Sequence, residues 1–299
     1  MTSLTSLPGL ADRPARVPGL LCPAIVAHRG ASLRYPENTL AAFRAAVRAG
    51  ADVIELDARL TADGVPVVMH DADVATTTDG SGFVHELTLA QVSALRAGRD
   101  PARRVRVATL RQALAYLRGR ATVKIDLRNQ PGEPGFDGTH RVAAEALRLV
   151  HELRLGPVIV ASANPETMEW VRWHHPDAVT GIEAGAGENL WEWIDYAAGQ
   201  GHTFLMPDAA AVLSAGADFV ARAHAHGVQV DVWTVNDAET VSGLFSWGAD
   251  LVETDDPELA IPARNRARIA GPIAARNPVV RSKVERVAMS SSLPGKVLQ

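Results

Sequence analysis

Residues that suit acid–base and phosphate chemistry follow two apolar segments near the start of the chain. His28 and Arg29 come directly after the run AIVA, and His70 comes directly after the run VPVVM. Histidine exchanges protons near neutral pH, and arginine can hold a phosphate through two parallel hydrogen bonds. Two histidines can act as base and acid, one deprotonating a nucleophile and the other protonating a leaving oxygen. These residues therefore indicate chemistry on an anionic substrate.

Three carboxylates lie within other apolar segments. Glu55 and Asp57 are two residues apart in DVIELDARL, and Asp126 precedes Arg128 by two residues in ATVKIDLR. Side chains two apart in a strand point to the same face. Carboxylate oxygens suit Ca²⁺ or Mg²⁺, whereas clustered carboxylates without a cation repel one another. A divalent cation, together with Arg29 and Arg128, would neutralise the charge that develops on an attacked phosphorus, so this set indicates phosphodiester cleavage.

Some of these candidates, and two further ones, also have a purely structural interpretation. Glu55 and Asp126 could each form a buried ion pair with a neighbouring arginine, without any metal. Glu37 begins a helical segment, where it would either contact the substrate or cap the helix and brace the site. Trp233 lies in the run QVDVWTV and would either pack in the core or form a wall against the alcohol part of a substrate.

Apolar strand-like runs alternate with helical runs along the body of the chain. The eight runs are AIVAH, DVIELDARL, ATVKIDLR, PVIVASA, AVTGIEA, TFLMPD, QVDVWTV and ADLVETD. This alternation predicts parallel strands and a (β/α)8 barrel, in which strand ends meet at one mouth. A further run, VPVVMH, follows after only TADG, so it must fold back as a hairpin. An open doubly wound sheet is the alternative, although no glycine-rich phosphate loop follows the first strand.

The other segments are predicted to lie outside the strand–helix repeat. We expect the barrel to span residues 21–262, with an insertion over residues 72–107 after the second strand. Residues 1–20 are expected to form a tail, and residues 263–299 a basic, disordered tail. That second tail holds eight basic side chains and one acidic side chain, a net charge of +7. It would be simply solvated, in contact with an anionic surface such as a membrane, or docked on the acidic body of the same chain.

Composition narrows the class of protein. The net charge of -4 argues against a nucleic-acid partner, and no run approaches the ~18 apolar residues of a membrane helix. The N-terminal residues lack the charged and apolar regions of a signal peptide, and the single cysteine, Cys22, excludes an internal disulfide. We therefore expect a cytoplasmic protein whose partner is a small phosphodiester substrate.

Four segments of the chain resemble the glycerophosphodiester phosphodiesterase family. They lie in order between residues 24 and 259 and read AHRGASLRYPENTLAAF, GADVIELDARLTADGVPVVMHD, KIDLR and VDVWTVND…GADLVETDDP. The resemblance implies a (β/α)8 barrel with an insertion after the second strand. It also implies that His28 and His70 form the acid–base pair and that Glu55 and Asp57 bind a metal.

The third of these segments departs from the family pattern. The family's third strand usually carries Glu and, two residues on, Lys, where this chain carries Asp126 and Arg128. Asp is one methylene shorter than Glu, and Arg replaces a point donor with a planar fork. We expect one divalent cation, Ca²⁺ or Mg²⁺, with Mn²⁺ and Zn²⁺ as alternatives.

The resemblance implies metal-dependent hydrolysis of a glycerophosphodiester to glycerol 3-phosphate and an alcohol such as choline or ethanolamine. The nucleophile would be water or the glycerol 2-hydroxyl, with His28 favoured as base and His70 as acid. A lysophospholipase D-like or phosphoinositide-cleaving activity is an alternative that needs an apolar approach, yet the insertion contains only Phe83 as an aromatic residue. The change at Asp126 and Arg128 also leaves open a catalytically silent barrel that binds phosphate compounds.

Overall fold

Eight parallel strands form a closed barrel in the computed structural model, which describes residues 17–98 and 105–270. Neighbouring strands pair in chain order, and β1 pairs with both β9 and β2, which closes the ring. The predicted (β/α)8 barrel is confirmed. The barrel strands are β1 (Ala24–Ala27), β2 (Val53–Leu60), β4 (Thr122–Leu127), β5 (Val158–Ser162), β6 (Val179–Ala184), β7 (Phe204–Pro207), β8 (Gln229–Val232) and β9 (Leu251–Thr254).

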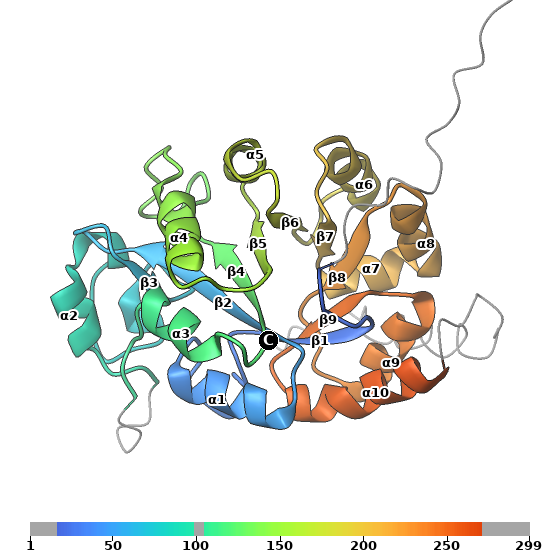
Figure 1. Cartoon of the computed structure of the whole chain (residues 1–299), viewed down its shortest axis with the longest axis horizontal. Coiled ribbons are helices and arrows are strands. Elements are labelled where there is room, and N and C mark those ends of the chain that lie inside the picture. Colours follow the sequence, from blue (N-terminus) through green and yellow to red (C-terminus); the bar gives the residue numbers. More distant parts are fainter. Residues whose placement is uncertain (1–16, 99–104, 271–299) are drawn as a thin grey trace, which may run out of the picture.

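Helices surround the barrel and carry the chain from each strand to the next (Figure 1). Thr39 caps the start of helix α1 (Leu40–Ala49), where its hydroxyl accepts a hydrogen bond from the Ala42 amide, and Gly50 caps the end in the left-handed conformation. Apolar side chains of these helices, such as Phe43 and Leu114, are fully buried against the strands. The helices are α1 (Leu40–Ala49), α3 (Leu110–Leu117), α4 (Arg141–Glu152), α5 (Pro165–His174), α6 (Leu190–Gly199), α7 (Ala209–Ala215), α8 (Ala217–Ala225), α9 (Ala238–Trp247) and α10 (Pro257–Ala270).

An apolar cluster fills the part of the barrel where the strands begin. Val26, Val53 and Phe204 belong to it, and Val17 and Leu20 pack against them from the N-terminal segment. Val17 is only 3% exposed. The predicted tail over residues 1–20 is therefore corrected, because its last residues close this end of the barrel; residues 1–16 lie outside the described residues.

The insertion begins as the predicted hairpin. Strand β3 (Pro66–Val68) pairs antiparallel with β2, and the insertion continues through η1 (Val74–Thr76), η2 (Val84–Glu86) and α2 (Leu89–Ala94). It lies beside the ring of helices at the left of Figure 1. Its apolar residues form a separate small cluster, which includes Val74, Val84, Val92 and Val107. The insertion thus has a core of its own next to the open end of β2.

Helix α10 continues beyond the predicted end of the barrel at residue 262. Arg264 Nη1 lies 2.6 Å from Asp52 Oδ2, and Arg268 Nη2 lies 2.9 Å from Asp52 Oδ1. Arg264 is only 8% exposed. The tail predicted over residues 263–299 is therefore corrected, because part of its basic charge fastens α10 to the barrel. Residues 271–299 lie outside the described residues.

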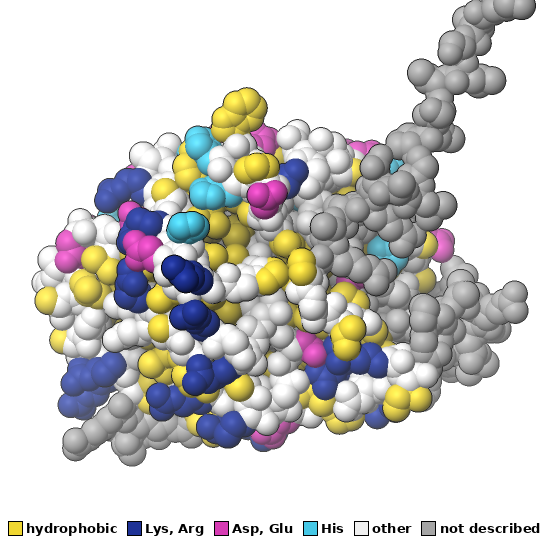
Figure 2. All heavy atoms as spheres, viewed as in Figure 1, with side chains coloured by type: hydrophobic (Ala, Val, Ile, Leu, Met, Phe, Trp, Pro, Cys, Tyr) yellow, Lys and Arg dark blue, Asp and Glu magenta, His cyan; other side chains and the backbone are white. Residues whose placement is uncertain are grey.

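Basic side chains gather over α1, α3 and α4 on the face shown in Figure 2. Several of them pair with acidic neighbours, as Arg111 does with Glu152 and Arg148 with Glu145. Exposed pairs of this kind contribute only about 0–1 kcal/mol each to stability. This surface therefore keeps the protein hydrated, while the energy of the fold comes from the buried clusters.

Candidate active site

The carboxyl ends of the strands surround a cavity of about 250 Å³. Of the site residues predicted from the sequence, only Glu37 is absent from its lining. The predicted residues that line it are His28, Arg29, Glu55, Asp57, His70, Asp126, Arg128 and Trp233. The barrel thus brings together residues from five segments that are far apart in the sequence.

His28 follows β1 and is held by a carboxylate from the other end of the chain. Its Nδ1 lies 2.7 Å from Asp255 Oδ1, and Asp255 also accepts hydrogen bonds from Ser32 and Asn236. Burial alone would raise the pKa of Asp255, but these donors hold it at about 2. Because an ionised carboxylate only accepts, Nδ1 of His28 carries a hydrogen, and in the neutral ring the lone pair therefore lies on Nε2. Asp255 was not among the site residues predicted from the sequence.

Unusual backbone conformations shape the turn after β1. Arg29 has a φ of 54° and Asn38 a φ of 57°, values that non-glycine residues seldom adopt. Gly30 has a φ of +86°, and a Cβ there would lie 2.7 Å from the backbone of Ala42. The Arg29 amide donates to Glu55 Oε2 at 2.6 Å. The glycine is therefore required for close packing against α1, and the turn ties β1 to β2.

Glu37 braces Arg29. Arg29 Nη1 donates to Glu37 Oε1 at 2.9 Å, while Arg29 Nε lies 3.4 Å from Asp57 Oδ2. Asn38 holds the second of these carboxylates, since its Nδ2 donates to Asp57 Oδ2 at 2.7 Å. This placement favours the bracing role of Glu37 over direct contact with a substrate.

His70 follows β3 and also lies beside a carboxylate. Its Nδ1 is 3.0 Å from Asp71 Oδ1, and its backbone carbonyl accepts a hydrogen bond from Arg59 Nε at 2.6 Å. The side chains of His28 and His70 are 18% and 26% exposed, so both rings can be reached from the mouth of the barrel. Each histidine thus has one ring nitrogen occupied by an aspartate.

Glu55, Asp57 and Asp126 form a buried carboxylate cluster whose oxygens lie within 4.8 Å of one another. Burial, with the charges of Asp57 and Glu253, raises the pKa of Glu55 well above its ordinary value, and burial likewise raises that of Asp126. The pKa of Asp57 falls to about 2, because the charges of Arg29 and other neighbours outweigh its burial. The cluster therefore holds unfavourable negative charge that a cation would relieve.

A buried lysine beneath this cluster was missed from the sequence. Lys124 Nζ lies 3.0 Å from Asp231 Oδ2 and 2.7 Å from Glu253 Oε2. His28, Glu55 and Glu253 make up a second group with metal-binding geometry, but Lys124 already neutralises Glu253 there. The first cluster is therefore the better cation site. The Lys124–Glu253 pair did leave a signal in the sequence, because Lys124 and Glu253 are charged residues inside the apolar runs VKID and VETD.

Asp126 of β4 and Arg128, which replace the Glu and Lys of the family pattern, contact each other. Arg128 Nη1 donates to Asp126 Oδ2 at 3.0 Å, and Arg128 Nη2 donates to Glu133 Oε1 at 2.8 Å. The other oxygen, Asp126 Oδ1, is buried and has no hydrogen-bond partner among the described residues. A buried acceptor without a donor is costly, and a hard cation would satisfy it. The chemistry of this donor set therefore fits a divalent metal.

Trp233 lies directly after β8 and forms part of the cavity wall. Its indole Nε1 donates to the carbonyl of Met206 at 2.8 Å, which fixes the ring. The residue therefore packs against the apolar cluster inside the barrel and also presents a surface to the cavity, while its contact with the alcohol part of a substrate stays a prediction.

This arrangement suits the cleavage of a phosphodiester, because proton acceptors, positive charge and a candidate cation site face one cavity. A sequence model of the glycerophosphoryl diester phosphodiesterase family matches residues 28–259. The chain is 31% identical over 246 residues to a glycerophosphodiester phosphodiesterase of Caldanaerobacter subterraneus, covering 79% of this chain and 96% of that protein. The chain therefore belongs to the glycerophosphoryl diester phosphodiesterase family.

Solved structures agree with this assignment. The glycerophosphodiester phosphodiesterase of Agrobacterium tumefaciens has a TM-score of 0.66 and 27% identity, covering 81% of this chain and 99% of that one. A phosphodiesterase of Oleispira antarctica, solved with the product sn-glycerol-3-phosphate, has a TM-score of 0.74 and 24% identity, covering 82% of this chain and 97% of that one. The protein is thus a phosphoric diester hydrolase built on the predicted barrel.

Within the described residues, no helix is long and apolar enough to cross a membrane.

Proposed function

We propose that the protein hydrolyses glycerophosphodiesters with one divalent cation held by Glu55, Asp57 and Asp126. The observation that carries the metal assignment is the buried, unpartnered Asp126 Oδ1 within a cluster of carboxylates. When bound, the cation would neutralise charge on the phosphoryl oxygens. Oxygen ligands favour Ca²⁺ or Mg²⁺, and metal titration has to separate these from Mn²⁺ and Zn²⁺.

The chain's own residues supply the binding charge and the proton transfers. Arg29 and Arg128 place positive charge on the cavity wall, where they would bind the phosphodiester. His28, whose Nδ1–H is held by Asp255, would accept a proton at Nε2 from water or from the glycerol 2-hydroxyl. His70 would give a proton to the leaving oxygen. A new phosphorus–oxygen bond forms and the bond to the alcohol breaks, so that the alcohol leaves protonated.

The products we propose are glycerol 3-phosphate and an alcohol such as choline or ethanolamine. If the glycerol hydroxyl attacks, a cyclic phosphate forms first, and water then opens it with the histidine roles reversed. The intact His28–Asp255 and His70–Asp71 pairs argue against the alternative of a catalytically silent barrel that only binds phosphate compounds.

The structure offers little support for a lipid substrate. Such a substrate needs an apolar approach to the mouth, which the insertion would have to supply. Its valines instead turn toward each other, and its single aromatic residue, Phe83, is half-buried and stacked on His85 with ring centroids 5.7 Å apart. We therefore place a lysophospholipase D-like or phosphoinositide-cleaving activity second.

We also propose that the enzyme acts in the cytoplasm, which its single cysteine, Cys22, and its small polar substrate support. Contact of the basic C-terminal segment with anionic surfaces stays a prediction, since residues 271–299 lie outside the described residues. The small phosphodiester is the partner to which the site is suited.

Release of glycerol 3-phosphate from glycerophosphocholine tests the proposed function. His28→Ala is expected to lower kcat by about 10²- to 10⁴-fold, the usual contribution of a general base, while the affinity for glycerol 3-phosphate changes only a few-fold. A protein that only binds phosphate compounds would instead show no turnover, either as the parent or as the His28→Ala variant. Turnover on a lysophospholipid but not on glycerophosphocholine would establish the alternative substrate class.

A further inference from the structure

Glu133 contacts two arginines that belong to different strands of the barrel. Its Oε1 accepts from Arg128 Nη2 at 2.8 Å, and its Oε2 accepts from Arg59 Nη2 at 2.7 Å. Arg59 extends from β2 and Arg128 follows β4. The three side chains are 26%, 8% and 10% exposed for Glu133, Arg59 and Arg128, so water screens these pairs only in part.

A defined turn places the Glu133 carboxylate between the arginines. The Glu133 amide donates to the Gln130 carbonyl at 3.1 Å, and the two residues between them are Pro131 and Gly132. Gly132 has a φ of +87°, as the third position of a type II turn requires. The segment PGEPG therefore has a local reason to fold at this point, and Glu133 is presented by a turn rather than by an open loop.

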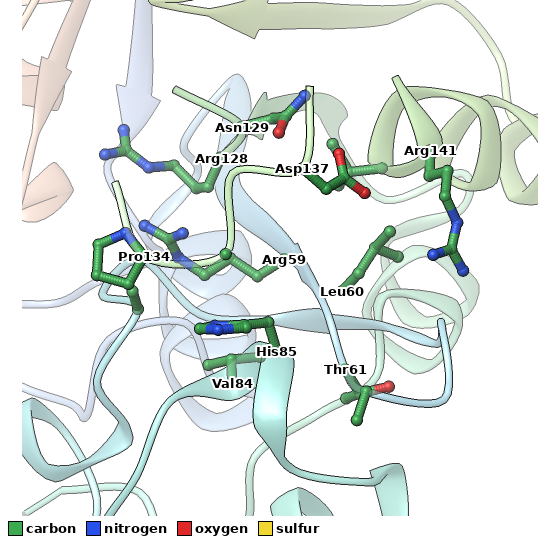
Figure 3. Close-up of a pocket in the computed structure, with 14 residues that line it drawn as sticks. Arg59, Leu60, Thr61, Val84, His85, Arg128, Asn129, Pro134, Asp137 and Arg141 are labelled. Carbon is green, nitrogen blue, oxygen red and sulfur yellow. The ribbon is translucent and has the colours of Figure 1, made fainter. Parts of the chain in front are cut away.

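Both arginines reach this turn from the same side. Figure 3 shows Arg59 and Arg128 extending side by side toward the segment that carries Pro134, the residue after Glu133. The two arginines also line a second cavity of about 210 Å³, which lies next to the insertion, and Arg128 lines the active-site cavity as well. The Glu133 pairs thus stand at the border between the two cavities.

Each arginine also contacts the catalytic constellation. Arg128 Nη1 donates to Asp126 Oδ2, and Arg59 Nε donates to the backbone carbonyl of His70. Glu133 therefore connects, through one arginine each, a proposed metal ligand and a proposed acid–base residue. A lysine at position 128 would offer a single point donor, whereas arginine offers a fork that can bind two carboxylates at once. Glu133 provides the second carboxylate that the fork needs.

We propose that Glu133 is a positioning residue for hydrolysis, which fixes Arg128 against the phosphate site and Arg59 against the strand end that carries His70. This inference rests on the proposed role of Arg128 in binding the phosphodiester. Without Glu133, one arm of the Arg128 fork loses its partner, and the guanidinium is free to turn further onto Asp126. The arginine would then be less available for the substrate.

Glu133→Gln tests this role because it keeps the size of the side chain and removes its charge. We expect kcat/KM for glycerophosphocholine to fall about tenfold, the effect of losing one charge-assisted hydrogen bond, and the affinity for glycerol 3-phosphate to fall with it. Asp137→Asn is the matched control, since Asp137 lies in the same loop but, within the part of the chain that the structure describes, accepts hydrogen bonds only from Thr139. The control is expected to stay within twofold of the parent enzyme.

A double-mutant cycle separates positioning from folding. In an Arg128→Lys background, Glu133→Gln is expected to cost less than it does in the parent enzyme, because lysine does not use the second carboxylate and only the contact through Arg59 is then lost. Binding of glycerol 3-phosphate gives the same comparison even where turnover is too slow to measure. An equal loss in both backgrounds, or a Glu133→Gln enzyme as active as the parent, would overturn the proposal. Absence of turnover in the parent enzyme would instead count against the proposed function.

Discussion

Replacing Asp255 by Asn should impair hydrolysis although Asp255 lies outside the cavity lining. The carboxylate lies 2.7 Å from His28 Nδ1 and fixes both the ring and its tautomer. An amide can present either a donor or an acceptor to that nitrogen, so the tautomer with a free Nε2 is no longer enforced. The substitution leaves the size of the side chain unchanged and removes the charge that faces the proposed base, while Ser32 and Asn236 also lose a charged acceptor.

The magnitude follows from the strength of the interactions around Asp255. Its pKa falls from 3.8 to about 2, although burial alone would raise it, and hydrogen bonds from His28, Asn236 and Ser32 are responsible. A shift of that size corresponds to about 2 kcal/mol shared among these donors. Because His28 is one of three donors, we expect kcat/KM to fall about fivefold to tenfold, the loss that about 1–1.4 kcal/mol of transition-state stabilisation produces.

The assay is release of glycerol 3-phosphate at neutral pH by the parent and Asp255→Asn enzymes. Asp256→Asn is the control, because this neighbouring carboxylate pairs with Arg34 instead of His28. An Asp255→Asn enzyme within threefold of the parent, or an equal loss in the control, would refute the assignment of Asp255 as the partner that orients the base.

Asp255 also predicts a pH dependence of stability. Since its folded-state pKa is lower than its ordinary value of 3.8, its contribution is complete above that value and is lost as the pH falls through about 2. Urea unfolding of the parent and Asp255→Asn proteins should therefore differ most at neutral pH, and the difference should shrink between about pH 4 and pH 2. A difference that stays constant over this range would contradict the depressed pKa.

Three other substitutions test separate parts of the site. Asp126→Asn should raise the concentration of divalent cation needed for half-maximal activity at least about tenfold, as measured by metal titration after chelation. Lys124→Met should lower the free energy of unfolding by about 3–5 kcal/mol, because it leaves Asp231 and Glu253 buried without a cation, and urea titration would detect this. Gly30→Ala should reduce both thermal stability and kcat, since its Cβ would lie 2.7 Å from the backbone of Ala42.

The barrel and most of its site could be predicted from the sequence because they depend on local patterns. Continuous apolar runs identified the strands, and the short TADG link identified the hairpin that ends at His70. The rule that parallel strands share one mouth then brought Glu55, Asp57 and Asp126 together. Spacing within one strand carries this kind of information well.

Partners that lie far apart in the sequence could not be predicted in the same way. Asp255 reaches His28 across 227 positions, and Lys124 reaches Glu253 across 129. Such contacts depend on strand register and side-chain rotamers, which cannot be predicted from a single sequence. The limits of the tails were misplaced for a similar reason, because Val17 and Arg264 are held by contacts with distant parts of the barrel.

Activity after removal and return of the metal tests the central assignment most directly. The enzyme would be stripped with a chelator, supplied in turn with Ca²⁺, Mg²⁺, Mn²⁺ or Zn²⁺, and assayed for glycerol 3-phosphate release from glycerophosphocholine. We expect the stripped enzyme to be inactive and one of the oxygen-preferring cations, Ca²⁺ or Mg²⁺, to restore turnover in the parent but not in His28→Ala. Full activity of the stripped enzyme, or equal activity of His28→Ala, would contradict a metal-dependent hydrolysis in which His28 moves the proton.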